Sequence, residues 1–331
     1  MTLFGAIQAY IDVKRAHGVL FDKATKDLWS FSRRVGDVSL DQIKPTQIRD
    51  FLNGPRTRAG TWRKKFSLLR FFFEYWSARG LLDGSPMPPL RLPGAPTFEP
   101  YVPYVYTRNE VRVLLRATSL WENCCWQNRY MARMDSGTFR ILLLILYATG
   151  MRMGEALNLL RKDVDVSRGA ITINGGRYTQ PRTIPIGPDL KAQLRRYKRG
   201  LGRANGESLF FVGKDGKALN DGSVRVAFRK LRGLTGIQRH DGAIYQPRLH
   251  DLRATFAVHR LTSWLRQGAD LNRLIPALSA YMGQVGLGST ERYLKLTPER
   301  FRTHLLKLSP QHPGRKRWRD DPALMKFLEG L

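Results

Sequence analysis

Seven prolines lie between positions 86 and 103 and divide the chain into two parts. Proline lacks a backbone N–H group and has a fixed φ, so a proline-rich stretch favours an extended backbone over a helix or a central strand. We therefore predict a semi-rigid linker over residues 86–104, with one domain on each side. The length of 331 residues agrees with this division, because a single hydrophobic core seldom extends over so long a chain.

The first part, residues 1–85, has apolar residues at the three- and four-residue intervals that are typical of helices. Helices are expected around residues 3–11, 28–35 and 48–52, and glycines at positions 18 and 36 mark the ends of the first two. A longer helix is predicted from an apolar stripe that runs from Trp62 to Trp76 and is ended by Gly80. The first domain is thus expected to be a helical bundle.

The other face of that longest helix is basic. It carries Arg58, Arg63, Lys64, Lys65 and Arg70. A charged face is commonly just a solvated face, but here no acidic residue balances the cations before Glu74. We therefore interpret this face as a DNA-binding surface, with simple solvation as the alternative.

The second domain, residues 105–312, shows both helical and strand patterns. A capping box at Thr107 and Glu110 begins a helix, and an apolar helix is expected around residues 139–147. Two strands, 170–173 and 183–186, are joined through Gly175, Gly176 and Arg177. Further helices are expected around residues 190–197, 224–231, 250–265 and 271–281. The fold class predicted is mainly α with a small antiparallel sheet.

The tail, residues 313–331, is expected to form either a basic arm or a short amphipathic helix that docks on a partner.

The charge of the chain points to a nucleic acid partner. Lysine and arginine number 56 against 27 acidic residues, a formal net charge of +29. So large a charge repels itself unless a polyanion binds to it. An anionic membrane is the rival partner, but the cations are not gathered on one amphipathic helix. RNA is the less favoured nucleic acid because nothing resembles a base-stacking module.

Several other classes of protein are disfavoured. The two cysteines, Cys124 and Cys125, are adjacent and have no clustered histidines, so neither a disulfide framework nor a zinc site is expected. The longest apolar run is too short for a membrane span, and the N-terminus lacks a signal-peptide pattern. We expect a protein of the bacterial cytoplasm that contacts no membrane and holds no metal or other cofactor.

Three local groupings carry residues suited to phosphate chemistry. Arg152 lies between two glycines after an apolar helix, and Glu155 is placed to orient its guanidinium. His250 and Arg253 share one helix face, where they could bind a phosphate and move a proton. Tyr293 follows a glycine-rich stretch. Each grouping alone has a structural alternative: an ion pair, a histidine bonded to nearby backbone, and a packing aromatic.

Taken in order, the three groupings resemble the tyrosine recombinase (phage integrase) family. Arg152 with Glu155, then His250 with Arg253, then Tyr293 match the family in residue type, order and spacing. The stretch 274–298 is most similar to the transposon-encoded branch. The resemblance implies a helical core-binding domain at residues 1–85, the linker, and a mixed α+β catalytic domain at residues 105–312.

The family resemblance also implies a mechanism. Tyr293 would attack a DNA phosphate and form a 3′-phosphotyrosyl link, while Arg152 and Arg253 bind the non-bridging oxygens. His250 would act as general acid–base and phosphate ligand. Neither ATP nor a metal is implied, and the isolated Asp163 and Asp165 do not form the carboxylate cluster that metal-dependent strand transfer needs. Arg182, directly before the second strand, is expected among the DNA-binding residues.

Two positions depart from the family pattern. Arg177 stands in the strand-to-strand turn where the family has a lysine that protonates the leaving oxygen. Arginine holds its proton too firmly to be an efficient acid, although it can stabilise negative charge. Gln284 stands where the family usually has histidine or tryptophan. Glutamine can donate a hydrogen bond to a phosphate oxygen, but it cannot gain a charge.

The leading hypothesis is therefore a site-specific recombinase or transposase that acts on duplex DNA in the integration, excision or transposition of a mobile element. Family members work as tetramers, so a homo- or hetero-tetramer on DNA is expected. The alternative is a weak or inactive accessory DNA-binding subunit that assists other recombinases. A third hypothesis is a topoisomerase-like enzyme that relaxes DNA without a special site.

Overall fold

The computed structural model describes residues 1–19, 21–54, 57, 59–89, 101–121, 134–175, 181–202, 205–243, 245–284 and 287–297. The chain forms two compact units, Met1–Tyr101 and Val102–Leu331. Arg58, Arg177, the adjacent cysteines and the tail after residue 312 lie outside the described residues. The expectations stated for them remain predictions.

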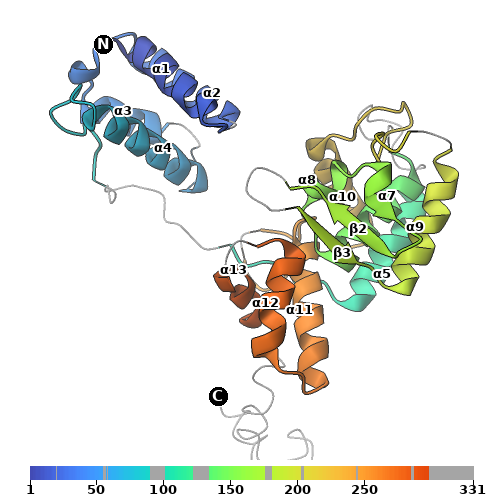
Figure 1. The fold of residues 1–331 in the computed structure, drawn as a ribbon. Helices are drawn as coiled ribbons and strands as arrows, with labels where there is room; N and C mark the ends of the chain where they lie inside the picture. The colour runs from blue at the N-terminus through green and yellow to red at the C-terminus, as the bar shows by residue number, and fades with distance from the viewer. Residues whose placement is uncertain are drawn as a thin grey trace, which may run out of the picture. The chain divides into compact units, whose positions relative to one another are not determined.

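The first unit is helical, as its apolar periodicity predicts (Figure 1). Its helices are α1 (Leu3–Ala16), α2 (Asp22–Val35), α3 (Pro45–Leu52) and α4 (Ala59–Ser77), with a 3-10 turn at Leu40–Gln42. The apolar stripe of α4 is buried in a core that it shares with α1, α2 and α3. Pro45 is the first residue of α3, a position where its missing N–H costs no hydrogen bond.

The second unit is mainly helical (Figure 1). The capping box expected at Thr107 and Glu110 is present at the start of α5. The α-helices of this unit are α5 (Arg108–Ala117), α7 (Ser136–Thr149), α8 (Met153–Leu157), α9 (Pro188–Gly200), α10 (Asp221–Leu234), α11 (Asp251–Arg266), α12 (Leu271–Met282) and α13 (Leu287–Leu294). Short 3-10 turns lie at Thr118–Leu120 and Arg161–Asp163.

A three-stranded antiparallel sheet completes the second unit, in the order β1 (Val164–Asp165), β2 (Ala170–Ile173), β3 (Arg182–Pro185). Ile171 pairs with Ile184, and Ile173 pairs with Arg182. The sequence pattern predicted β2 and β3 but missed β1, because two residues are too few to show an alternation. A mainly α fold with a small antiparallel sheet is thus confirmed.

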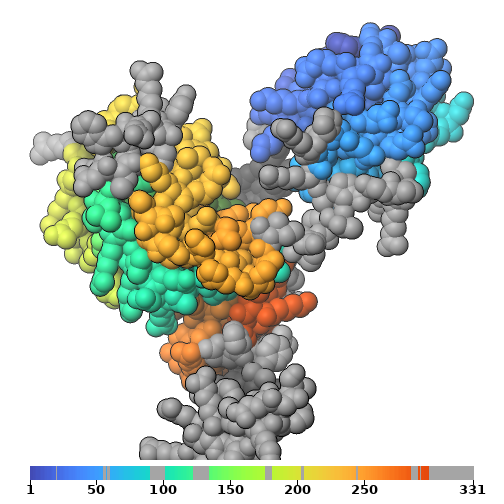
Figure 2. Space-filling model, turned by 180° about the vertical axis from the view of Figure 1, so that it is seen from behind, coloured from blue at the N-terminus to red at the C-terminus, as the bar shows by residue number. Residues whose placement is uncertain are grey.

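The core of the second unit is built around α7. This helix is apolar on nearly every side, and it packs against both α9 and α11. Helices α5 and α10 also contact each other, and they lie side by side on the back of the unit (Figure 2). In the part of the chain that the structure describes, no helix combines the length and the apolar character needed to cross a membrane.

Candidate active site

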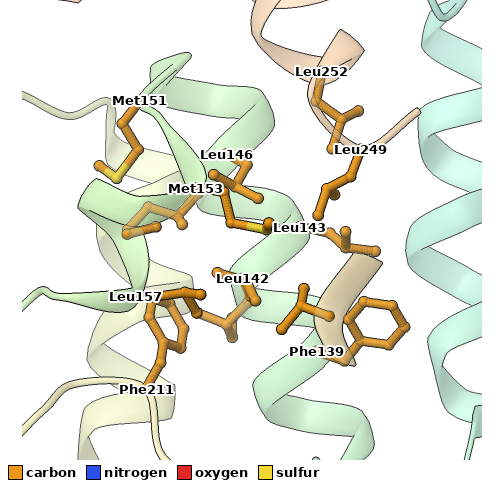
Figure 3. Packing of buried hydrophobic residues seen from close by; sticks show 14 of the residues in the cluster. Phe139, Leu142, Leu143, Leu146, Met151, Met153, Leu157, Phe211, Leu249 and Leu252 are labelled. Atoms are coloured by element: carbon orange, nitrogen blue, oxygen red, sulfur yellow. The ribbon is translucent and has the colours of Figure 1, made fainter. Parts of the chain in front are cut away.

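Arg152 lies immediately before α8, as its N-cap residue, directly after the turn that ends α7. The turn depends on Gly150, whose φ of 62° lies in the left-handed region and whose Cα faces the ring of Phe256. Met151 and Met153, on either side of Arg152, point into the core (Figure 3). This anchoring of both neighbours leaves the Arg152 side chain, 39% exposed, at the surface of the unit.

The carboxylate of Glu155 lies between two guanidinium groups. Its Oε1 accepts a hydrogen bond from Arg152 Nη1 at 2.9 Å, and its Oε2 accepts one from Arg182 Nη2, also at 2.9 Å. The side chain is only 8% exposed. Burial raises the pKa of Glu155, but the hydrogen bonds from Arg182 and Arg152 outweigh it and hold the pKa below its ordinary value. The carboxylate is therefore a charged, fixed support for Arg152, as the sequence indicated.

The C-terminal end of α12 is held by three arginines. Arg182 Nε donates to the carbonyl of Tyr281 at 2.9 Å, Arg253 Nη2 donates to that of Met282 at 2.9 Å, and Arg152 Nη2 donates to that of Gly283 at 2.9 Å. Carbonyls at a helix C-terminus lack intrahelical partners and carry partial negative charge, so cations are favoured there. The helix end thereby brings together side chains that are far apart in the sequence.

Arg253 lies at the centre of the cluster. It is 5% exposed, and its Nη1 donates to the carbonyl of Gly150 at 2.6 Å. Burial lowers the pKa of Arg253, and the nearby hydroxyl of Tyr293 opposes that shift, while the charge of Arg152 adds to it. Arg152, Arg253 and Tyr293 are therefore close enough to influence one another electrostatically.

His250 lies immediately before the first turn of α11, between buried leucines. Leu249 and Leu252 point into the core below it (Figure 3), while the His250 side chain itself is exposed. Partial desolvation by surrounding atoms lowers the pKa of His250, as does the positive charge of Arg253. The imidazole is therefore mostly neutral at pH 7 and can accept a proton.

Gln284 follows Gly283 and connects the end of α12 to the candidate nucleophile. Its Nε2 donates a hydrogen bond to the Tyr293 hydroxyl at 3.4 Å, and its Oε1 accepts one from the buried hydroxyl of Thr290. The Thr290 contact could not be predicted, since a threonine inside a helix has no particular signature. The Thr290 hydroxyl anchors the amide beside Tyr293.

The basic residues of α4 belong to the first unit. Arg63, Lys64 and Arg70 are exposed, whereas Lys65 is half-buried with its Nζ 4.2 Å from the centre of the Phe51 ring. Arg70 also pairs with Glu74 at 3.6 Å. The structure thus places these cations on the solvated face of α4, opposite its buried apolar stripe.

Arg182 was also expected to contact DNA, but unlike the cations of α4 it is nearly buried. Its guanidinium is only 11% exposed and donates hydrogen bonds within the protein. Its placement argues against the direct DNA contact that the sequence suggested.

The described residues offer little to a metal ion. Asp163 accepts hydrogen bonds from the backbone of Leu160 and from Asn174, and Asp165 caps the turn that follows β1. Within the described ranges, no three histidine, cysteine or acidic side chains cluster in a way that could hold a metal.

A cavity of about 1000 Å³ lies elsewhere, between α7, α9, α11 and α12. It is lined mainly by apolar side chains such as Leu144, Phe256 and Trp264, and it does not include Arg152, His250, Arg253 or Tyr293. The cationic cluster at the end of α12 is the better candidate site, because guanidinium groups bind phosphate oxygens and apolar side chains do not.

Comparison with known proteins gives a consistent result. The model of the phage integrase family matches residues 120–300. A putative integrase/recombinase, y4rB of Sinorhizobium fredii (strain NBRC 101917 / NGR234), is 28% identical over 95% of this chain and 98% of its own. The tyrosine recombinase XerC of Staphylococcus aureus (strain MSSA476) is 25% identical over 82% of this chain and 84% of its own.

Solved structures show the same fold. A lambda integrase dimer bound to a COC' core site matches with a TM-score of 0.63 at 18% identity, covering 88% of this chain and 77% of the integrase. The Tn1549 transposon integrase in complex with a circular intermediate DNA matches with a TM-score of 0.62 at 18% identity, covering 93% and 100%.

Proposed function

Because the chain belongs to the phage integrase family of tyrosine recombinases, we propose that it cleaves and rejoins duplex DNA at a specific site, in the movement of a mobile element. The observation that carries the proposal is the cluster around Arg253. The guanidinium groups of Arg253 and Arg152 donate to the adjacent carbonyls of Met282 and Gly283. The next residue, Gln284, donates to the Tyr293 hydroxyl, and His250 lies three residues before Arg253. A nucleophile beside two fixed cations and a neutral imidazole is suited to attack on a phosphodiester.

In the proposed reaction, the Tyr293 oxygen attacks phosphorus and forms an O–P bond. The bond from phosphorus to the 5′-oxygen breaks, and that oxygen leaves as a hydroxyl after it gains a proton from solvent water or from the His250 imidazolium that forms when Tyr293 loses its proton. His250, whose lowered pKa keeps it mostly neutral, accepts the proton from Tyr293. A 5′-hydroxyl from a second strand then reverses the step, so the phosphotyrosyl link conserves the bond energy without ATP.

Arg152 and Arg253 are proposed to bind the non-bridging oxygens, whose negative charge grows as the transition state forms. Both guanidinium groups are already oriented by Glu155 and by backbone carbonyls, so little reorganisation is needed when DNA binds. Gln284 donates to the Tyr293 hydroxyl and can donate to a phosphate oxygen in the complex. Arg177 would stabilise charge on the leaving 5′-oxygen, a role that the resemblance assigns to its position.

We further propose that duplex DNA is the partner, that the basic face of α4 contributes phosphate contacts, and that the chain acts as a homo- or hetero-tetramer. The formal charge of +29 and the exposed Arg63 and Lys64 support DNA binding. The related lambda integrase has been seen as a dimer on a core site and as a tetramer on a Holliday junction.

The test uses a nicked suicide duplex that carries the chain's own recombination site, found by selecting bound sequences from random duplexes. We expect a protein–DNA adduct that survives denaturation and disappears in Tyr293→Phe. The absence of any adduct on a proven site would overturn the proposal. Relaxation of plasmids that lack the site would point instead to a topoisomerase-like activity.

An accessory DNA-binding subunit is the second candidate, favoured by Arg177 and Gln284 in place of the family's usual residues. Such a subunit would bind its site without forming adducts. It would also support recombination by partner recombinases equally well after Tyr293→Phe. Mixing wild type and the Tyr293→Phe variant with the partner enzymes distinguishes the two candidates.

A further inference from the structure

Arg182 holds two parts of the candidate active site at once. It is the first residue of β3, where it pairs with Ile173, and its side chain crosses from the sheet to α8 and to the end of α12. Its guanidinium is 11% exposed, which leaves little surface for a phosphate. We propose that Arg182 is a positioning residue that orients Arg152 through Glu155, and Tyr293 through the end of α12.

The first connection runs through Glu155. Arg182 Nη1 and Nη2 donate to Oε1 at 3.2 Å and to Oε2 at 2.9 Å, so the guanidinium fork fixes the plane of the carboxylate. The same two oxygens accept hydrogen bonds from Arg152 Nη1 at 2.9 Å and from the Arg152 backbone N–H at 2.8 Å. A rotation of the carboxylate would therefore move the Arg152 guanidinium.

The second connection runs through the end of α12. Arg182 Nε donates to the carbonyl of Tyr281 at 2.9 Å, and Nη2 donates to that of Met282 at 3.3 Å. Gly283 packs directly against the guanidinium. A Cβ at this position would lie only 2.5 Å from Arg182 Cζ, so no larger residue fits there without a shift. The next residue is Gln284, which donates to the Tyr293 hydroxyl. Arg182 thus supports the backbone from which the amide reaches the nucleophile.

The arrangement requires arginine in particular. Binding both carboxylate oxygens and two carbonyls needs several N–H donors in one rigid plane, which the single ammonium group of lysine does not offer. Loss of the fork would leave Glu155 bonded to Arg152 without the support of Arg182. It would also remove the side-chain donor to the Tyr281 carbonyl, while the Met282 carbonyl would keep only its bond from Arg253. We expect small displacements of Arg152 and Tyr293, and displacements of about 1 Å can reduce a rate by roughly 100-fold.

The inference rests on the proposed cleavage activity, and its test compares Arg182→Met and Arg182→Lys with wild type on the suicide duplex. The cleavage rate at saturating DNA, the Kd over a range of salt concentrations, and Tm are all measured. The matched control is Arg161→Met. Arg161 likewise donates to backbone carbonyls at a helix C-terminus, those of Leu201 at 3.0 Å and Gly202 at 3.0 Å, which directly follow α9.

We expect Arg182→Met to cleave roughly 10- to 100-fold more slowly than wild type at saturating DNA. Arg182→Lys should recover part of the rate. Kd and its salt dependence should stay close to those of wild type, and Arg161→Met should cleave at the wild-type rate. In addition, Glu155→Gln should slow cleavage much less in the Arg182→Met background than in wild type, because both residues act on Arg152.

Three results would overturn the inference: an unchanged cleavage rate in Arg182→Met, an equal loss in Arg161→Met, or a weaker Kd with a smaller salt dependence and normal saturated cleavage. The last would make Arg182 a phosphate contact. If wild type forms no adduct on its proven site, the proposed function itself fails. A failure of this inference alone instead leaves wild-type cleavage intact.

Discussion

The side-chain amide of Gln284 donates a hydrogen bond to the hydroxyl of Tyr293 across 3.4 Å, and the buried Thr290 hydroxyl holds the other end of that amide. The amide can face the tyrosine with either its nitrogen or its oxygen, and only the nitrogen donates. The Thr290 hydroxyl therefore anchors the amide whose nitrogen faces the candidate nucleophile.

This relationship makes Thr290 testable. Thr290→Val keeps the shape of the side chain but removes the hydroxyl, so we expect cleavage at saturating DNA to fall roughly 5-fold, equivalent to about 1 kcal/mol for one hydrogen bond. Thr290→Ser keeps the hydroxyl and should cleave at nearly the wild-type rate. Equal rates for the valine and serine variants would contradict a role for the Thr290 hydroxyl in holding Gln284.

Gly150 should tolerate no side chain. Its φ is 62°, and a Cβ would lie 2.4 Å from Phe256 Cδ1. We expect Gly150→Ala to lower the free energy of unfolding by roughly 2–5 kcal/mol, from the left-handed backbone and the overpacking together. Denaturant unfolding followed by circular dichroism measures this.

The matched control is Gly233→Ala in α10, where a Cβ meets nothing within 4 Å. Alanine is favoured over glycine inside a helix, so this variant should be as stable as wild type or more stable by up to about 1 kcal/mol. A similar loss of stability in both variants would contradict the close approach of Phe256 to Gly150.

The lowered pKa of His250 should make the free energy of unfolding of the DNA-free protein depend on pH. Its folded-state pKa lies below the ordinary value of 6.5, because of partial desolvation and the charge of Arg253. The unfolded chain therefore binds more protons as the pH falls below about 6.5, and the folded state loses stability there. We expect wild type to lose more stability between pH 7 and pH 5 than His250→Gln does.

The His250 expectation can be checked by urea unfolding of both proteins at each pH. A histidine proton resonance that titrates above pH 6.5 in wild type and is missing in His250→Gln would contradict it. Bound DNA is left out of the measurement because its phosphates would favour the charged imidazole.

The basic face of α4 should govern DNA affinity and leave the chemical step unchanged. We expect the double variant Arg63→Gln with Lys64→Gln to bind more weakly and to reduce the slope of log K against log salt by about 1 for each cation removed. Cleavage at saturating DNA should match wild type. Fluorescence anisotropy at several salt concentrations measures the slope.

A control for α4 removes two exposed lysines from another helix of the same unit, Lys23 and Lys26 of α2. If this Lys23→Gln with Lys26→Gln variant reduces the slope as much as the α4 variant does, the contribution of α4 is only its net charge. A specific phosphate contact by α4 would then be excluded.

Much of the fold could be predicted from the sequence, because the relevant signals are local. Apolar residues recur at helical spacing in α4, the capping box at Thr107 and Glu110 begins α5, and alternation marks β2 and β3. The pairing of Arg152 with Glu155 was also foreseeable, since residues three apart at the start of a helix lie within reach of each other.

Only the tertiary structure decided how the candidate site is held together. The contact of Arg152 with Gly283 joins residues 131 apart, and that of Arg182 with Tyr281 joins residues 99 apart. A backbone carbonyl has no signature in the sequence, so neither the pairing of α12 with three arginines nor the burial of Arg182 could be inferred from residue type. The sequence by itself determined which reactive side chains the chain carries and in what order. Their convergence depends on the packing of α7, α11 and α12, which leaves unpaired carbonyls at one helix end where buried guanidinium groups need acceptors.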